Sequence, residues 1–163
     1  MTLDDLLARE AIRHTLASYN MAGDRLRLED FVAVFTEDAV LESAGASPGE
    51  GFRCEGREAI RRWMSGFDSR PNRPASIEPP RFVRHHLTTS QIELTGPGTA
   101  TARTYFHVLT QIGPDHAGYY VDVLRRTGER WLIAERRIRI DWRAPNSLFR
   151  TRDDGAGEAC QDA

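Results

Sequence analysis

Residues 82–94 read FVRHHLTTSQIEL, and this alternation of side-chain types predicts a β-strand with one buried face. Successive side chains of a strand point to opposite faces of the sheet. Val83, His85 and Leu87 therefore share one face, and His86 falls on the other. Because aliphatic residues stand two positions to either side of His85, its imidazole is expected to point into an apolar interior, with His86 pointing outward.

Turn signals divide the rest of the second half into further strands. Glycine and proline gather at residues 96–98 and 113–114, and a third turn signal covers 127–129, as is typical of hairpins. We therefore predict strands at residues 82–94, 99–112, 117–127 and 130–142. His107 is expected to point outward from the second of these strands, and His116 is expected to lie in a turn.

The first half of the chain has apolar residues at helical spacing. A helix is predicted over residues 3–22, and a shorter amphipathic stretch covers residues 28–35. A short strand is predicted at 39–43, and a third helix from Gly56 has an apolar face made of Ile60, Trp63, Met64 and Phe67. Helices followed by a meander indicate an α+β fold, with the helices on one face of a curved antiparallel sheet.

The chain has the length of one domain. We expect that domain to span residues 1–149 and the polar tail, residues 150–163, to be disordered. The segment Pro71–Pro80 is too rich in proline to join the sheet. Because this segment directly precedes the strand that carries His85, we expect it at the mouth of a pocket, as a lid or rim.

Composition argues against several classes of chemistry and partner. The net charge is −2 without a long basic run, which disfavours nucleic-acid binding. All 22 basic residues are arginine, so no lysine can form a Schiff base or bind pyridoxal phosphate. With no apparent signal peptide and no apolar run of about 20 residues, we expect a cytoplasmic protein without membrane contact. Cys54 and Cys160 lie far apart in sequence and suggest neither a disulfide framework nor a zinc site.

Asp24 follows the first predicted helix and is a candidate partner for His85. An imidazole in an apolar cavity, oriented and charge-balanced by a carboxylate, can act as a general base. The alternative is a core histidine satisfied by a backbone carbonyl, with an Asp24 that only caps the next helix. Residue types alone favour the second interpretation.

Six blocks of sequence, taken in order, resemble one protein family. They are REAIRHTLASYNMAGD (9–24), FTEDAVLE (35–42), GREAIRRWM (56–64), RHHLTTSQIEL (84–94), TATARTYFHV (99–108) and RTGERWLIAERRIRIDW (126–142). The set is similar to the SnoaL-like, or polyketide-cyclase-like, branch of the nuclear-transport-factor-two-like superfamily. That branch includes scytalone dehydratase, bile-acid dehydratase and hexachlorocyclohexane dehydrochlorinase. The resemblance implies a cone-shaped sheet that wraps around three N-terminal helices and encloses an apolar pocket.

The resemblance also implies roles for single residues. In these enzymes an aspartate after the first helix holds a histidine that removes a proton next to a leaving group, and the matching positions are Asp24 and His85. Tyr19 matches a tyrosine of bile-acid dehydratase, so its phenol would bond a carbonyl or a leaving hydroxyl, or else be an ordinary core tyrosine. The sequence departs from the family at Thr110 (the second histidine of scytalone dehydratase), Gly23 (its extra tyrosine) and Val108 (the catalytic aspartate of bile-acid dehydratase).

The expected pocket residues lie on the inward faces of the strands and of the third helix. They are Trp63, Met64, Phe67, Val83, Leu87, Phe106, Val108, Thr110, Tyr120, Asp122, Arg136, Ile138 and Ile140. Asp122 and Arg136 are expected to pair across strands, either as a salt bridge that fixes the sheet or as part of an epoxide-hydrolase-like site. No histidine has partners at metal-ligand spacing, so we expect neither a metal nor another cofactor.

The function that the resemblance implies is that of a cofactor-free lyase or isomerase. Such an enzyme would be a dehydratase, double-bond isomerase or cyclase, as in polyketide biosynthesis and other secondary metabolism, with a hydrophobic polyketide- or steroid-like substrate. The alternative is a non-catalytic binding or assembly module, like the small subunit of ring-hydroxylating dioxygenases. Apolar residues on the outward side of the strands predict self-association, as a homodimer or homotrimer.

Overall fold

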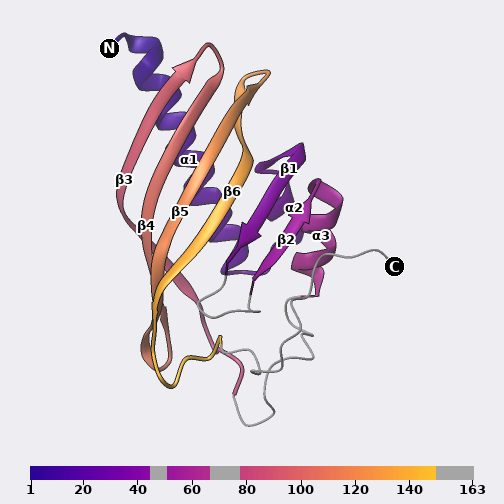
Figure 1. Cartoon of the computed structure of the whole chain (residues 1–163), viewed down its shortest axis with the longest axis vertical. Helices are drawn as coiled ribbons and strands as arrows, with labels where there is room; N and C mark the ends of the chain where they lie inside the picture. The colour runs from indigo at the N-terminus through magenta and orange to yellow at the C-terminus, as the bar shows by residue number, and fades with distance from the viewer. Residues whose placement is uncertain (45–50, 67–77, 150–163) are drawn as a thin grey trace.

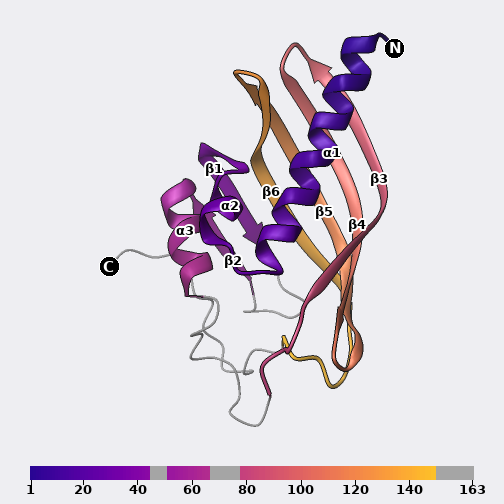
Figure 2. The same ribbon diagram turned by 180° about the vertical axis from the view of Figure 1, so that it is seen from behind.

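Helices come first and a long sheet second in the computed structural model, which describes residues 1–44, 51–66 and 78–149. The elements are α1 (Leu3–Gly23), α2 (Leu28–Val32), β1 (Phe35–Ser43), β2 (Phe52–Glu55), α3 (Arg57–Ser65), β3 (Arg84–Gly96), β4 (Thr99–Thr110), β5 (Gly113–Thr127) and β6 (Arg130–Arg143). Strands β3 to β6 form a long, bent sheet (Figure 1), and α1 lies along one of its faces (Figure 2). The predicted α+β fold is confirmed. The predicted disordered tail and residues 71–77 of the proline-rich segment lie outside the described residues.

The six strands form one open sheet in the order β2-β1-β6-β5-β4-β3. All neighbouring strands are antiparallel apart from β1 and β6, which run parallel and make the sheet mixed. The short strand β2 was not predicted, and β1 begins at Phe35 rather than Ala39. Phe35 was predicted to belong to a helix, but it pairs with Ile133 of β6 and is completely buried. Pairing and burial here outweigh the helical spacing of the local sequence.

Helix α1 determines the position of Asp24, the proposed partner of His85. A capping box starts the helix, because the Thr2 hydroxyl accepts from the Asp5 N–H while the Asp5 carboxylate accepts from the Thr2 N–H. Along its length the helix buries Ile12, Leu16 and Tyr19 in the core that it shares with the sheet. It ends at Gly23, which leaves Asp24 at the point where the chain turns away from the helix.

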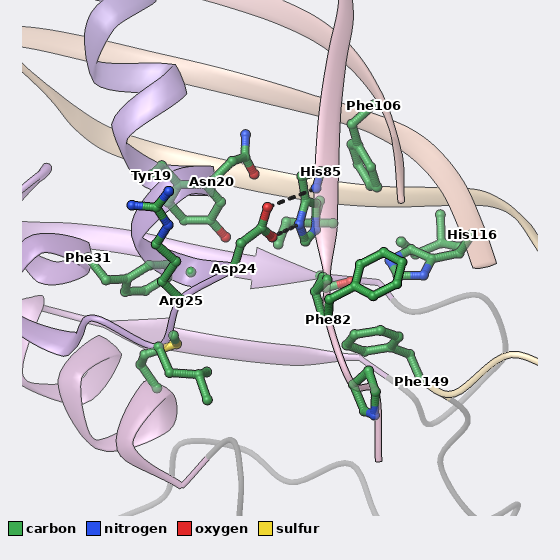
Figure 3. A pocket seen from close by; sticks show the side chains of 18 of the residues that line it. Tyr19, Asn20, Asp24, Arg25, Phe31, Phe82, His85, Phe106, His116 and Phe149 are labelled. Carbon is green, nitrogen blue, oxygen red and sulfur yellow. Dashed lines mark hydrogen bonds and ion pairs between the residues drawn. The ribbon is translucent and has the colours of Figure 1, made fainter. Parts of the chain in front are cut away.

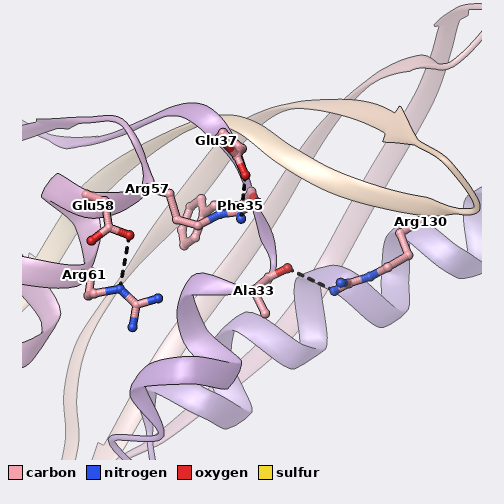
Figure 4. Close-up of polar contacts among 7 residues, drawn as sticks. All are labelled: Ala33, Phe35, Glu37, Arg57, Glu58, Arg61 and Arg130. Atoms are coloured by element: carbon pink, nitrogen blue, oxygen red, sulfur yellow. Dashed lines mark hydrogen bonds and ion pairs between the residues drawn. The ribbon is translucent and has the colours of Figure 1, made fainter.

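Arginine side chains hold the junction between α2 and β1. Arg57 of α3 donates from Nε to the Phe35 carbonyl at 3.2 Å, and Arg130 of β6 donates to the Ala33 carbonyl at 3.0 Å (Figure 4). Glu37 lies 3.5 Å from Arg57. These carbonyls stand where a helix ends and a strand begins, so they need partners outside their own element. The contacts therefore secure β1 between α3 and β6.

The two faces of the sheet are divided as the alternation predicts. His86 is exposed and stacks on His107 of β4 on the outer face, with ring centres 4.8 Å apart, whereas His85 is only partly exposed on the inner face.

The expectation for the cysteines is wrong, because buried Cys54 is disulfide-bonded. Cys160 lies outside the described residues. Separation along the sequence does not report distance in space, which is what a disulfide requires.

Two irregularities bend the sheet near one end of β5. The register shifts between Val108 and Leu109 of β4, and again between Ala117 and Gly118 of β5. At the second shift the backbones of β5 and β6 come so close that a Cβ on Gly118 would lie 1.8 Å from the Arg139 carbonyl oxygen. Bulges of this kind increase the local bend of a strand. Glycine is therefore required at this position by the close approach of β6.

Gly118→Ala should destabilise the protein by about 1–3 kcal/mol or more, because the added methyl collides with backbone that cannot move aside alone. Urea unfolding followed by circular dichroism measures the change. Gly66→Ala is the matched control, because a Cβ there would meet only ordinary contacts, at 3.7 Å or more. Equal stability of the two variants would contradict the argument for Gly118.

Candidate functional site

Asp24 and His85 form a doubly bonded pair at the end of α1. His85 Nδ1 lies 2.6 Å from Asp24 Oδ1, and the His85 backbone N–H donates to Asp24 Oδ2 at 2.9 Å (Figure 3). The side chain of Asp24 is 8% exposed and that of His85 is 22% exposed. One carboxylate therefore fixes both the imidazole and the backbone of β3 from which it projects. The alternative in which Asp24 only caps the next helix does not describe these contacts.

This geometry selects one form of the neutral imidazole. A carboxylate accepts hydrogen bonds, so a neutral His85 places its single proton on Nδ1 and donates it to Asp24. The lone pair is then on Nε2, at the other side of the ring. When Nε2 takes up a proton, the carboxylate faces the resulting positive charge at close range. The pair has the arrangement that a general base requires.

A cavity of about 410 Å³ opens beside this pair, with His85 and Asp24 in its wall. Aromatic side chains from eight parts of the chain make up much of its lining: Tyr19, Phe31, Phe52, Trp63, Phe82, Phe106, Tyr120 and Phe149. Aliphatic residues Ile138 and Ile140 of β6 add to the apolar wall. A cavity of this size and lining suits a small ring compound.

The predicted pocket residues divide into two groups. Those in the lining are Trp63, Met64, Val83, Phe106, Tyr120, Ile138 and Ile140, together with Tyr19, Asp24 and His85. Those that face inward without lining the cavity are Leu87, Val108, Thr110, Asp122 and Arg136. All of this second group except the partly exposed Leu87 are buried by their neighbours. An inward direction along a strand therefore does not by itself bring a residue to the cavity. Phe67 lies outside the described residues.

Asp122 and Arg136 make the predicted cross-strand pair in the core. Arg136 donates to both carboxylate oxygens of Asp122, from Nε at 2.7 Å and Nη2 at 2.8 Å, and both side chains are completely buried. The guanidinium carbon lies 4.1 Å from the ring centres of both Tyr19 and Tyr120. Its Nη1 makes no hydrogen bond with the described residues, so the electron-rich ring faces provide the remaining stabilisation.

Tyr19 and Tyr120 both contact Arg136 and both line the cavity, so they lie between the buried ion pair and the cavity. Burial raises the pKa of the Tyr19 phenol above its ordinary value, so its hydroxyl stays protonated and can donate a hydrogen bond. Burial likewise raises the pKa of Tyr120, whose hydroxyl donates to Asn20 Oδ1 at 3.1 Å. Tyr19 is therefore the phenol that a bound molecule can use as a donor.

A second histidine–aspartate pair in the wall was not predicted. His116 was expected in a turn, but it belongs to β5, is 8% exposed and lines the cavity. Its Nδ1 lies 2.8 Å from Asp115 Oδ1, and its ring centre lies 6.2 Å from that of His85. The alternation of side chains along β5 could have revealed that His116 faces the cavity, because His116 stands an even number of residues before the inward-facing Tyr120. The Gly113-Pro114 turn signal hid the start of the strand.

The environment of this second pair sets its charge. Burial lowers the pKa of His116 below its ordinary value, helped by the nearby charges of His85 and Arg143 and opposed by Asp115. Burial also disfavours the ionised form of Asp115, but hydrogen bonds from His116, Ser147 and the Leu148 N–H hold its pKa below the ordinary value. Near neutral pH the pair is thus a neutral imidazole beside an ionised carboxylate.

The described end of the proline-rich segment reaches the cavity. Pro79, Pro80 and Arg81 are among the lining residues. Gln111, which follows β4, holds them by accepting from the Arg81 N–H at 2.9 Å and donating to the Pro79 carbonyl at 3.2 Å. This placement agrees with a rim at the mouth; a lid made by the rest of the segment stays a prediction.

Within residues 1–44, 51–66 and 78–149, no group of three or more histidine, cysteine, aspartate or glutamate side chains could hold a metal ion. None of the helices described there is long and apolar enough to cross a membrane.

Acidification should weaken the fold through His116. Because the pKa of His116 is lowered in the folded protein, the unfolded chain takes up this proton first, and the free energy of unfolding falls from about pH 7.5 to about pH 5.5. His116→Gln should show a smaller fall than the unmodified protein in urea unfolding at the two pH values. His14→Gln, at an exposed site on α1, should behave like the unmodified protein. An unchanged pH dependence in His116→Gln would contradict this assignment.

Several solved structures share this fold. A scytalone dehydratase-like protein from Novosphingobium aromaticivorans is 22% identical, with a TM-score of 0.70 over 93% of this chain and 99% of that one. Hexachlorocyclohexane dehydrochlorinase type 3 from Novosphingobium barchaimii is 15% identical, with a TM-score of 0.68 over 87% and 92%. The beta subunit of a protein assigned as an aromatic-ring-hydroxylating dioxygenase, from N. aromaticivorans, is 18% identical, with a TM-score of 0.68 over 88% and 96%. At these identities the likeness shows the fold alone.

Sequence comparison identifies the family. No curated protein matches the sequence significantly. The model of the SnoaL-like domain matches residues 4–137, which cover α1 through most of β6 and include both histidine–aspartate pairs. The chain therefore belongs to the SnoaL-like domain family.

Proposed function

We propose that the protein is a cofactor-free lyase or isomerase in which His85 is the general base and Asp24 its orienting partner. The observation that carries this proposal is the double hydrogen bond from His85 to Asp24 at the wall of an aromatic-lined cavity. The SnoaL-like family and its structural likeness to a dehydratase-like protein and a dehydrochlorinase support an activity of this type.

In this mechanism His85 Nε2 removes a proton from a carbon of the substrate. The electron pair of that C–H bond forms a new double bond or an enolate, while the charge of the imidazolium is balanced by Asp24. Tyr19 donates a hydrogen bond to the carbonyl or to the leaving group. The imidazolium then returns its proton, to the leaving group in an elimination or to another carbon in an isomerisation. Dehydration, double-bond migration and cyclisation all begin with the same first step.

The proposed substrate is a hydrophobic, ring-containing small molecule of the polyketide or steroid type. Rings that stack on or pack against aromatic walls gain contact area at little cost in conformational freedom. The lining supplies such walls from several elements. Its polar and charged members are the two histidines, Tyr19, Tyr120, Asn20, Asp24, Arg25, Ser43, Arg81 and Arg143. This chemistry needs no bound metal or organic cofactor.

The epoxide-hydrolase-like alternative receives no support from the site. Both oxygens of Asp122 are bonded to Arg136, and neither residue lines the cavity. A carboxylate that is to position water must face the substrate. We therefore assign this pair to the support of the sheet and of Tyr19.

An assembly function remains a distinct hypothesis, favoured by the structural likeness to a dioxygenase beta subunit. Such a role depends on surfaces rather than on the cavity. It requires no oriented base, so the two hypotheses differ in what variants of Asp24 and His85 should do.

Self-association is proposed through the outer face of the sheet. Large hydrophobic side chains on this face are exposed to solvent: Tyr105 is 48% exposed, Val121 37% and Trp142 48%. Light scattering after gel filtration should give a dimer or trimer, and Val121→Arg should shift it toward the monomer. Leu7→Arg, on an exposed turn of α1, is the control and should leave the mass unchanged. A monomeric unmodified protein would reject this interface.

His85→Ala and Asp24→Ala should each reduce turnover by about 10²–10⁴-fold while the protein stays folded, since this is the range for a positioned general base. Asp24→Asn should be nearly as damaging, because an amide can hold the ring but cannot balance its charge. The double variant should lose little more than either single one, because the pair acts as a unit. Tyr19→Phe should lose less. Turnover is measured against the hydrophobic substrates of dehydratases and cyclases.

His86→Gln is the matched control for these variants, because this neighbour points to the opposite face of the sheet. Before a substrate is known, the ¹⁵N chemical shifts of the His85 ring provide a test: Asp24→Ala should reduce the population that carries its proton on Nδ1. Full activity of His85→Ala would exclude the enzyme as proposed and favour the assembly function.

A further inference from the structure

The carboxylate of Asp115, like that of Asp24, accepts several hydrogen bonds, one of them from a histidine ring. The mechanism proposed above does not use the Asp115–His116 pair. Asp115 is completely buried, and its carboxylate accepts from His116 Nδ1, from the Ser147 hydroxyl at 2.6 Å and from the Leu148 N–H at 2.9 Å. The three donors come from the strand and from the segment that follows β6. Their convergence fixes a negative charge directly behind the imidazole.

This arrangement decides which edge of His116 is available. With Nδ1–H donated to an ionised Asp115, the lone pair of the neutral ring is on Nε2. Nδ1 faces the protein, so the cavity is reached by the remaining edge of the ring. The groups around it are His85 of β3, Phe106 of β4, Arg143 of β6 and Phe149.

The two imidazoles lie close enough to contact one bound molecule. Their ring centres are 6.2 Å apart and their planes are nearly perpendicular, at 82°. Both line the same cavity (Figure 3). A molecule whose carbon lies against His85 therefore also reaches His116. The other carboxylate at the site, Asp24, already accepts two hydrogen bonds from His85.

We propose that His116 is a second substrate-contacting residue, and that its Nε2 accepts a hydrogen bond from a hydroxyl group on the ring-containing substrate of the proposed enzyme. The proposal rests on the proposed function for the identity of the bound molecule as a substrate. It adds a requirement to the substrate class: the ring system carries a hydroxyl group close to the carbon that loses its proton. Asp115 acts through His116 and is a positioning residue.

A purely structural role is the competing explanation. Asp115 also joins β5 to the segment after β6, since its backbone carbonyl accepts from the Ala144 N–H at 2.7 Å. His116 could merely contribute to that join. A structural role would make no distinction between ligands that differ only in a hydroxyl group, so ligand pairs of this kind separate the two explanations.

The experiment compares 2-naphthol with its methyl ether, 2-methoxynaphthalene, by calorimetric titration at neutral pH. The two probes share their ring system and differ in the hydrogen-bond donor. The unmodified protein should prefer 2-naphthol by about tenfold, the effect of one well-formed hydrogen bond in an apolar site. His116→Phe should reduce the preference to near unity, whereas His107→Phe, on the outer face, should preserve it.

A second measurement guards against misfolding of His116→Phe. In the unmodified protein, the ¹⁵N signal of His116 Nε2 should shift when 2-naphthol is added and stay in place with the ether. Equal affinity for both probes, binding of neither, a preference that survives in His116→Phe, or a stationary Nε2 signal would each overturn the proposal. Failure of the proposed function has a different signature, because it would show as full turnover in His85→Ala with the 2-naphthol preference intact.

Discussion

The buried pair between Arg136 and Asp122 is the interaction on which the rest of the site depends. Replacing one partner of such a pair leaves an unpaired buried charge, at a cost of about 3–5 kcal/mol. The guanidinium also contacts the faces of Tyr19 and Tyr120. Tyr19 belongs to the last part of α1, so the position of that helix end, and hence of Asp24, follows from a charge held in the middle of the sheet. Asp24 in turn fixes His85.

This chain of contacts explains how an open sheet can hold a precise site. The imidazole of His85 stands on β3, the outermost strand at its edge of the sheet, where one neighbour supplies all the pairing. Such a strand needs a further anchor. The Asp24 carboxylate supplies it through the backbone N–H of His85 as well as the ring. Orientation of the His85 imidazole and attachment of the strand are therefore the same interaction, and loss of Asp24 should affect both.

Side-chain periodicity predicted the long strands and the inward direction of His85, because each depends on local alternation. The parallel pairing of β1 with β6 and the short strand β2 depend on partners far away in sequence, so local patterns missed them. His116 was missed for a related reason: the turn residues before it end the apparent strand early, while pairing with Arg143 and Val108 extends it. Leu87 and Val108 point inward as predicted, yet packing, which the sequence does not display, keeps them from the cavity.

The location of His116 bears on how this fold can vary its chemistry. Val108 occupies the position at which the resemblance aligns the aspartate of bile-acid dehydratase, and it pairs across the strands with His116. A polar group can thus reach this part of the cavity from β4 or from β5. Here β4 contributes an aliphatic side chain and β5 an imidazole backed by a buried carboxylate. Asp24 holds the proposed base, His85, in place. The neighbouring strand pair offers a position where the second polar group can change without disturbing His85.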